Sequence, residues 1–228
     1  MWLLNSSIGR KLIMSISGLF LVFFLLFHMS MNIVAIISGE AYNMICEFLG
    51  ANWYALAGTL VLAAGVVVHI VYAFILTLKN QKARGAEGYA CSEKPKEVEW
   101  ASQNMFVLGL VVIGGLLMHF AQFWYKMQFA EIMGIHDAVA NGGISPVDGA
   151  AFIAFYFSQP VICVLYLIWL TALWFHLTHG FWSALQTIGW SNKIWLDRIQ
   201  CISKIVSTVI CLGFAVVVIV FFCKSLCA

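Results

Sequence analysis

The chain has 228 residues, of which 63% are hydrophobic and 10% are charged, and its formal net charge at pH 7 is +2. A soluble domain of this length needs a far more polar surface, so the composition excludes water as the solvent for most of the chain. The small net charge, without a basic patch interleaved with aromatic residues, argues against nucleic acid as a partner. We therefore expect the lipid bilayer to surround this protein.

Five long apolar segments follow one another along the chain, at about 12–37, 54–78, 104–128, 159–187 and 202–223. Each exceeds the roughly 20 residues that an α-helix needs to cross a bilayer. The pattern predicts an all-α fold, a bundle of five transmembrane helices that occupies residues 1–228 as one domain and leaves no room for a soluble catalytic domain. The first segment is too long for the core of a signal peptide, so we interpret it as a retained helix.

Charged residues are sorted between the connections. Basic residues precede the first segment, fill the second connection and flank the end of the fourth segment: Arg10, Lys11, Lys79, Lys82, Arg84, Lys94, Lys96, Lys193, Arg198 and Lys204. The connections 38–53 and 129–158 carry acidic residues instead: Glu40, Glu47, Glu131, Asp137 and Asp148. The positive-inside rule then predicts a cytoplasmic N-terminus and an external C-terminus, in the inner (cytoplasmic) membrane of the cell.

The long connection 129–158 is weakly amphipathic, and Gly142, Gly143 and Pro146 interrupt it. This pattern predicts a short surface helix followed by a loop on the outer face.

The seven cysteines, among them Cys91, show neither Cys-x-x-Cys nor Cys-x-x-Cys-His spacing. Covalent attachment of a c-type haem is therefore excluded, and the spacing argues against an iron–sulfur cluster.

Five of the six histidines fall inside apolar segments: His28, His69, His119, His176 and His179. Strongly polar side chains inside a membrane are costly, and those that occur usually serve a function. A single such histidine could equally bond a neighbouring helix.

The depths of the histidines sort four of them into two pairs. In the predicted topology, His28 and His119 each lie about nine residues before the outer end of their helix. An α-helix rises about 1.5 Å per residue, so the two histidines lie at nearly the same depth in the membrane. His69 and His176 each lie about ten residues before the inner end. Two histidines that face each other at one depth are what a six-coordinate haem needs as axial ligands, so we predict an outer haem on His28 and His119 and an inner haem on His69 and His176.

Glycines one turn from three of these histidines support the prediction. Gly65, Gly115 and Gly180 are each four residues from a histidine and share its helix face, where bare backbone would accommodate a porphyrin. Close packing between helices is the alternative explanation for these glycines.

The fourth segment offers two histidines, and either could be the ligand. Depth matching to His69 favours His176, which leaves His179 as a neighbour that bonds a haem propionate or a backbone carbonyl.

A zinc or di-iron site is the competing metal site. Such a site takes carboxylates beside the histidines, and no Asp or Glu occurs within the five apolar segments. Two axial histidines leave no open position on a haem iron, so electron transfer is the expected role.

At this point the chain resembles the di-haem cytochrome b membrane anchors of succinate:quinone oxidoreductases and fumarate reductases, in the single-polypeptide, five-helix form of Bacteroides-like bacteria. The resemblance covers the whole chain: histidines on the first three spans and the fourth-span stretch from Phe175 to Trp182. In that family a glycine follows the fourth ligand by four residues, which again selects His176.

The resemblance implies two haems b as cofactors, menaquinone or another quinone as the membrane substrate, and a flavoprotein subunit and an iron–sulfur subunit on the cytoplasmic face. It also implies that Ser7 and Arg10 lie near the inner haem or the quinone, although a basic cluster at the membrane surface is an equal explanation. Trp174 stands where some fumarate-reducing relatives carry a glutamate on a proton path, so the resemblance does not extend to that path.

A quinone site needs a hydrogen-bonding group or an acid at the membrane edge. Glu47, with Glu40, Tyr42 and Asn43, lies in the outer 38–53 connection beyond His28, although solvated loop residues would look the same.

Three functions compete. The chain could be an electron-transfer subunit of a succinate dehydrogenase or fumarate reductase, or a haem b subunit of another respiratory complex such as a hydrogenase or formate dehydrogenase. It could be a haem-free transporter with a histidine proton relay. It could also be a scaffold for other subunits.

Overall fold

The computed structural model describes residues 6–84, 100–135 and 143–227. Five helices in this part of the chain are long and apolar enough to cross a membrane, which confirms the predicted all-α bundle. They are α2 (Ser7–Ile37), α4 (Trp53–Arg84), the third span (Met105–Ile132), α9 (Pro160–Thr187) and α10 (Leu196–Leu226). Cys91, Lys94, Lys96, Asp137 and Gly142 lie outside the described residues.

The helices extend beyond the apolar segments. α2 begins at Ser7 rather than near residue 12, because the Ser6 hydroxyl caps it by accepting a hydrogen bond from the Gly9 amide at 2.9 Å. α4 continues to Arg84 rather than ending near residue 78. Capping residues and backbone hydrogen bonds decide where a helix ends, whereas hydropathy marks only the part that meets lipid.

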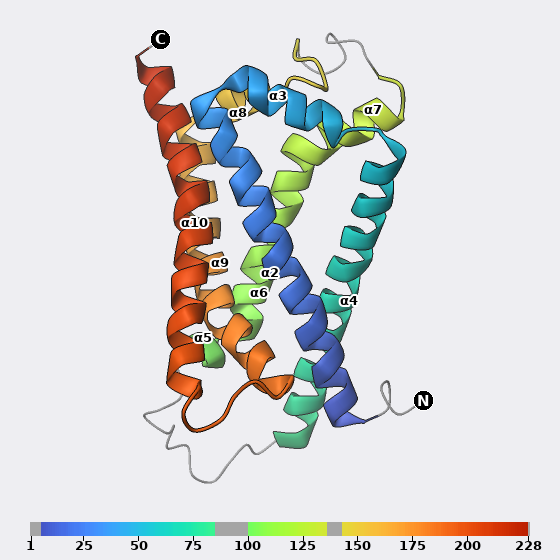
Figure 1. Ribbon diagram of the computed structural model, residues 1–228, viewed down its shortest axis with the longest axis vertical. Coiled ribbons are helices and arrows are strands. Elements are labelled where there is room, and N and C mark those ends of the chain that lie inside the picture. The colour runs from blue at the N-terminus through green and yellow to red at the C-terminus, as the bar shows by residue number, and fades with distance from the viewer. Residues whose placement is uncertain (1–5, 85–99, 136–142, 228) are drawn as a thin grey trace.

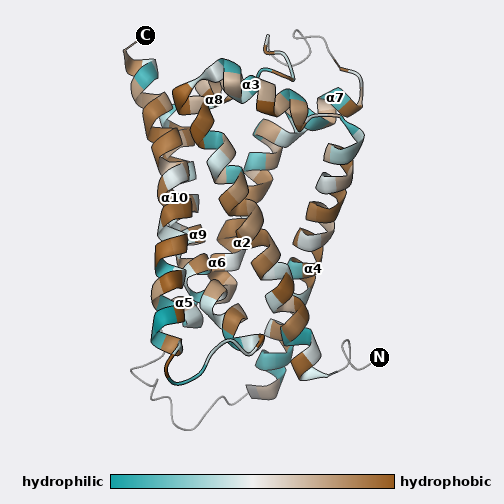
Figure 2. Cartoon of the chain, in the orientation of Figure 1, coloured by the Kyte–Doolittle hydropathy of each residue, from teal (hydrophilic) through white to brown (hydrophobic). Residues whose placement is uncertain are grey.

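The outward faces of the five spans carry large apolar side chains. Phe23, Val67, Leu117, Val161 and Ile205 are each more than half exposed. Hydrophilic residues gather at the two ends of the bundle, and hydrophobic residues fill the length between them (Figure 2). An exposed apolar belt of this size needs lipid around it, so the chain is a multi-pass membrane protein.

Two further helices close the end of the bundle opposite the N-terminus (Figure 1), which we call the α3 end. α3 (Gly39–Phe48) follows α2, and α8 (Gly149–Phe157) precedes α9. Asn43 of α3 donates to Asp148 at 2.8 Å and accepts from the Ala150 amide at 2.9 Å. These bonds clamp α3 to the start of α8.

The described part of the connection 129–158 does not have the predicted order of a surface helix followed by a loop, and residues 136–142 lie outside the described residues. The third span continues to Ile132 and a turn follows it, and the helix α8 comes last in the connection. α8 is not a surface helix either, because Phe152 and Ile153 are buried against the spans. The apolar residues of α8 pack into the bundle instead of lying along the membrane surface.

The third span changes its winding immediately after His119. α6 (Met105–His119) continues into the π-helix η1 (Phe120–Phe129), and α7 (Ala130–Ile132) completes the span. π-helical turns are rare and recur at functional sites. The change of winding here falls at a histidine that the sequence singles out.

The packing of the spans leaves a large internal space. α9 packs against α10, α2 and α6, and the short α5 (Trp100–Gln103) also lies on α9. α4 packs chiefly against α2 and leans away from the rest of the bundle (Figure 1). Residues of all five spans line a cavity of about 1300 Å³. Single small-molecule sites usually measure about 300–1000 Å³, so this cavity has room for more than one ligand.

Candidate functional site

Two pairs of histidines line the cavity. His28 of α2 faces His119 at the end of α6, with ring centres 5.9 Å apart and ring planes at 81°. His69 of α4 faces His176 of α9, with ring centres 6.3 Å apart and ring planes at 71°. The structure thus brings together the same pairs that the matching of depths predicts.

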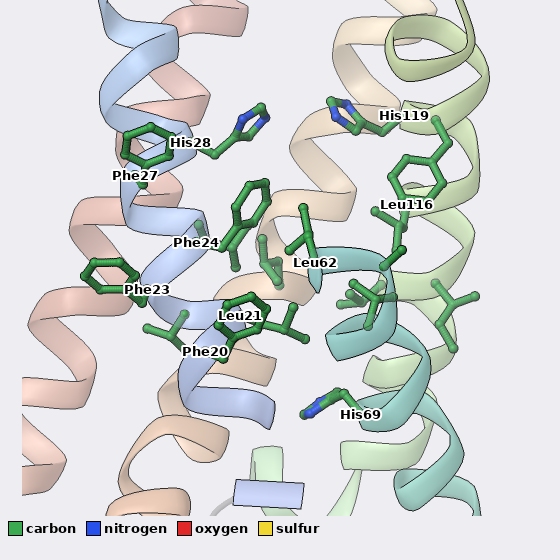
Figure 3. Close-up of a pocket in the computed structure, with 18 of the residues that line it drawn as sticks. Phe20, Leu21, Phe23, Phe24, Phe27, His28, Leu62, His69, Leu116 and His119 are labelled. Carbon is green, nitrogen blue, oxygen red and sulfur yellow. The ribbon is translucent and has the colours of Figure 1, made fainter. Parts of the chain in front are cut away.

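The two pairs lie at different levels of the bundle. The rings of His28 and His119 point toward each other, and His69 lies below them, toward the N-terminal end (Figure 3). Leu21 and Leu62 are among the apolar side chains between these levels. The cavity therefore holds two separate sites, one above the other.

The ring spacing suits two imidazoles that share one metal ion. A bond between a transition metal and an imidazole nitrogen is about 2 Å long, and the ring centre lies about 1.2 Å beyond that nitrogen. Two imidazoles on opposite sides of one ion then have ring centres roughly 6.3 Å apart. The observed separations of 5.9 and 6.3 Å are close to this value.

The histidine pairs can be compared with what different metal centres would need from the protein. Among residues 6–84, 100–135 and 143–227, no group of three or more His, Cys, Asp or Glu side chains could hold a metal ion. Zinc sites take at least three protein ligands, and di-iron sites in helix bundles take several carboxylates. A haem iron has four porphyrin nitrogens and needs at most two ligands from the protein. Two separate histidine pairs fit that requirement.

One nitrogen in the His69–His176 pair has no hydrogen-bond partner. His176 Nδ1 is one of two buried side-chain polar atoms without a hydrogen-bond partner in the described part of the chain. An unpaired buried polar atom costs free energy and often marks the place of a missing ion or ligand. A metal ion bound at His176 Nδ1 would give this atom a partner.

Polar side chains meet the other three rings. The Ser17 hydroxyl lies 3.4 Å from His69 Nδ1, and the Tyr166 hydroxyl lies 3.5 Å from His119 Nδ1. Asn32 Nδ2 lies 3.5 Å from His28 Nε2. Our sequence reasoning missed Ser17 and Tyr166, although a polar residue within an apolar span is itself a signal of function.

Of the three predicted glycines, only Gly180 lines the cavity. A Cβ atom at Gly115 would overlap the Trp169 ring, and one at Gly65 would lie 2.8 Å from the Phe20 ring. Gly65 and Gly115 therefore allow close packing between helices, which is the alternative to a contact with a porphyrin.

A glycine that the sequence did not single out lies beside a histidine. A Cβ atom at Gly18 of α2 would lie 3.2 Å from His69 Cε1. The spacing of four within one helix could not identify Gly18, because the two residues belong to different helices.

His179 and His176 occupy different surroundings. The ring of His179 packs edge-on against Trp182, with ring centres 5.1 Å apart, although His179 also lines the cavity. The ring that faces His69 is that of His176.

The structure does not bring Ser7, Arg10 or Glu47 to the cavity. Ser7 is exposed at the start of α2, and the cavity lining of α2 begins only at Met14, beyond Arg10. Glu47 is exposed on α3, where its carbonyl accepts a hydrogen bond from Asn52.

Other polar residues line the α3 end of the cavity instead: Tyr42, Cys46, Gln128 and Glu131. Gln128 donates to the Gly50 carbonyl at 3.0 Å, and the Glu131 carboxylate lies against Gly50. The third apolar segment ends at about residue 128, so the sequence places Glu131 in a connection and gives no sign that it lines the cavity. Burial raises the pKa of the Cys46 thiol to about 11, so the metal-binding thiolate form is scarce at neutral pH.

The fold and the site define a multi-pass helical membrane protein whose interior holds two facing histidine pairs. The chain matches no protein-family model, no curated protein and no solved structure.

Proposed function

We propose that this chain is a membrane cytochrome b that binds two haems b, one between His28 and His119 and one between His69 and His176. The observation that carries the proposal is that the two rings of each pair face each other in one apolar cavity, with ring centres 5.9 and 6.3 Å apart. This spacing would suit two imidazoles that bind one metal ion. Each pair joins two different helices, so a haem would also tie α2 to α6 and α4 to α9.

In this proposal the histidines bind the haems, neighbouring aromatic rings orient the histidines, and the apolar lining of the cavity excludes water. Phe24 stacks on the His28 ring at 5.4 Å with the planes 15° apart, and Trp169 packs on the His119 ring at 5.9 Å. These contacts restrict the rotation of the two imidazoles. The two histidines of each pair would hold a haem that supplies one-electron chemistry, and with both of them bound no position would remain for oxygen or a substrate. Electron transfer is the role that such a site supports.

We further infer that the chain is the membrane anchor of a succinate dehydrogenase or fumarate reductase complex. In that role it passes electrons between an iron–sulfur subunit and menaquinone or another quinone, while a flavoprotein subunit carries the dicarboxylate site. The support is the resemblance described above, from the histidines of the first three spans to the fourth-span stretch. Trp174, which replaces the glutamate of some relatives, donates to the Thr208 hydroxyl of α10 at 2.9 Å.

A haem-free histidine relay is the main competing function. A relay needs polar groups at hydrogen-bond spacing from one histidine to the next. Leucine side chains separate the level of His28 and His119 from that of His69 (Figure 3), which favours two metal sites over a relay.

Haem content tests the proposal directly. The purified full-length chain should show a reduced-minus-oxidised spectrum of low-spin b haem, and pyridine haemochrome quantitation should give two haems per chain. One haem or none would refute the proposal. A relay protein or a plain scaffold would show no haem absorbance.

The identity of the complex needs a separate measurement. A tagged chain purified from its native membrane should bring with it a flavoprotein and an iron–sulfur protein, and the preparation should reduce a quinone analogue with succinate. Co-purification of a hydrogenase or formate dehydrogenase subunit would contradict the assigned complex and leave the haem sites untouched.

A further inference from the structure

Each histidine pair has one member whose Nδ1 atom meets a hydroxyl group from another helix. Ser17 of α2 reaches His69 of α4 at 3.4 Å, and Tyr166 of α9 reaches His119 of α6 at 3.5 Å. Both hydroxyls hold a second, shorter hydrogen bond. Ser17 Oγ lies 3.0 Å from the Met14 carbonyl, and Tyr166 Oη lies 2.8 Å from Gln122 Oε1.

The second bond decides the direction of the first. A hydroxyl has a single hydrogen, and a carbonyl or amide oxygen can only accept. Ser17 therefore gives its hydrogen to Met14, and Tyr166 gives its hydrogen to Gln122. Each hydroxyl oxygen can then only accept from the histidine, so the proton of His69 and of His119 lies on Nδ1.

A proton on Nδ1 leaves the other ring nitrogen free. Neutral imidazole carries one N–H group and one lone pair, so Nε2 of His69 and of His119 holds the lone pair. The lone pair is what binds a metal ion. The hydrogen bonds of Ser17 and Tyr166 thus favour the tautomer with the proton on Nδ1, which is the one that can bind a metal ion through Nε2.

The partner histidines are held differently. His28 Nε2 meets Asn32 Nδ2, which can only donate, and His176 Nδ1 is buried without a hydrogen-bond partner. In each pair one imidazole is fixed by a hydroxyl from another helix and the other is not.

Ordinary packing is a weaker explanation for the two hydroxyls. A serine in a helix often donates to a carbonyl one turn earlier, and a buried tyrosine hydroxyl needs some partner. Neither habit requires the remaining lone pair to face a histidine. His69 also has a hydrogen bond with the Met14 backbone, so the two arrangements are not identical. In both pairs, however, a hydroxyl group from another helix meets Nδ1 of a histidine, and ordinary packing does not explain that.

We propose that Tyr166 and Ser17 are positioning residues that present Nε2 of His119 and of His69 to the two haem irons, and that each hydroxyl separately sets the potential of its own haem. This inference rests on the proposed function. A hydrogen bond from the distal N–H makes an imidazole a stronger donor, which stabilises the oxidised iron. Loss of the hydroxyl should therefore raise the midpoint potential of the haem it serves.

The test is a redox titration of the haem absorbance in the purified full-length chain. Tyr166→Phe should raise the potential of the haem that His119→Ala removes and leave the other unchanged. Ser17→Ala should raise the potential of the haem that His69→Ala removes and leave the haem of His119 unchanged. Gln122→Leu keeps the Tyr166 ring in place but frees its hydrogen to turn toward His119, so it should disturb the same haem as Tyr166→Phe.

Two matched variants control for the loss of a hydroxyl. Ser30→Ala removes an exposed hydroxyl of α2 that donates to the Leu26 carbonyl. Tyr156→Phe keeps a ring that packs on Phe123, as the Tyr166 ring does. Both should leave the two potentials unchanged.

The outcomes separate this inference from the proposed function. A wild-type chain without haem refutes the proposed function, and the inference with it. A wild-type chain with two haems whose potentials and low-spin EPR signals are the same in Tyr166→Phe, Gln122→Leu and Ser17→Ala refutes the inference alone. If Tyr166→Phe fails to accumulate, Gln122→Leu and Ser17→Ala carry the test.

Discussion

His28 and His119 come from helices that are far apart in the sequence, yet their rings point toward each other, with His69 lying well below them (Figure 3). If a haem joins each pair, removing either ligand of a pair has the same consequence, because an axial site needs both imidazoles.

The first residue-scale prediction follows from that equivalence. His28→Ala and His119→Ala should each abolish the same spectral component, and His69→Ala and His176→Ala should each abolish the other. Reduced-minus-oxidised spectra at low temperature, or a redox titration, would distinguish the two components. Loss of one common component from His28→Ala and His69→Ala would contradict the pairing.

His176 and His179 provide the second residue-scale prediction. They are three residues apart, so they differ by about 60° around the helix and about 4.5 Å in depth, and one iron cannot take both from one helix. The ring of His176 faces His69, and the ring of His179 packs on Trp182. His176→Ala should lose one haem, whereas His179→Ala should keep both. The opposite result in haem quantitation would make His179 the ligand.

The site could be predicted only in part at this scale. The rise per residue gives the depth of a histidine, and depth was enough to select the pairs that the structure brings together. It does not give the rotation of one helix against another. Ser17 and Tyr166 meet histidines of other helices, so they could not be found without the crossing geometry.

At the scale of helices, the apolar segments located the spans, but the sequence did not locate α3 and α8. Both begin at capping residues: Ser38 accepts from the Ala41 amide at 3.2 Å, and Asp148 accepts from the Ala151 amide at 3.0 Å. Such caps can be recognised in a sequence. The hydrogen bonds from Asn43 to the start of α8 cannot be recognised in a sequence, because they join residues that are distant along the chain.

The contact between α6 and α9 gives a prediction with a matched pair of glycines. Gly115 lies against the Trp169 ring, and Trp169 Nε1 donates to the Val112 carbonyl at 3.0 Å. A Cβ at Gly115 would push this ring away, so Gly115→Ala should lower the stability by about 1–3 kcal/mol. Gly114, next to it, has no atom within 4 Å of an added Cβ.

Gly114→Ala should therefore be neutral, or stabilise α6 by up to about 1 kcal/mol. Thermal unfolding in detergent would compare the two variants. Equal midpoints for Gly114→Ala and Gly115→Ala would show that α6 and α9 do not pack through Gly115.

At the scale of the whole molecule, charge differs between the two ends of the bundle. Eight of the ten basic residues of the described chain lie at the end that holds the N-terminus: Arg10, Lys11, Lys79, Lys82, Arg84, Lys193, Arg198 and Lys204. The other two, Lys126 and Lys224, lie at the α3 end. Four of the five acidic residues of the described chain lie at the α3 end, namely Glu40, Glu47, Glu131 and Asp148, and the fifth, Asp197, lies at the N-terminal end. The two termini lie at opposite ends (Figure 1), as five spans require.

This asymmetry predicts the orientation in the membrane. Basic connections stay in the cytoplasm, so the N-terminal end of the bundle should face the cytoplasm and the α3 end should face outward. Alkaline phosphatase fused after Ala228 should then be active, because its disulfides form only outside the cytoplasm. The same enzyme fused after Asn192, behind four spans, should be inactive, and a fluorescent protein fused there should fluoresce.

If the fusions gave the opposite activities, the basic end of the bundle would lie outside the cell. The proposed path of electrons through the chain would then change. His69 and His176 lie toward the N-terminal end, so in the predicted orientation their haem would be the nearer one to an iron–sulfur subunit in the cytoplasm. With the orientation reversed, His28 and His119 would hold that place, and the α3 end, with Gln128 and Glu131, would face the partner subunits instead of the outer membrane surface. The two fusions therefore decide which of the two proposed haems would be the nearer one to a partner subunit in the cytoplasm.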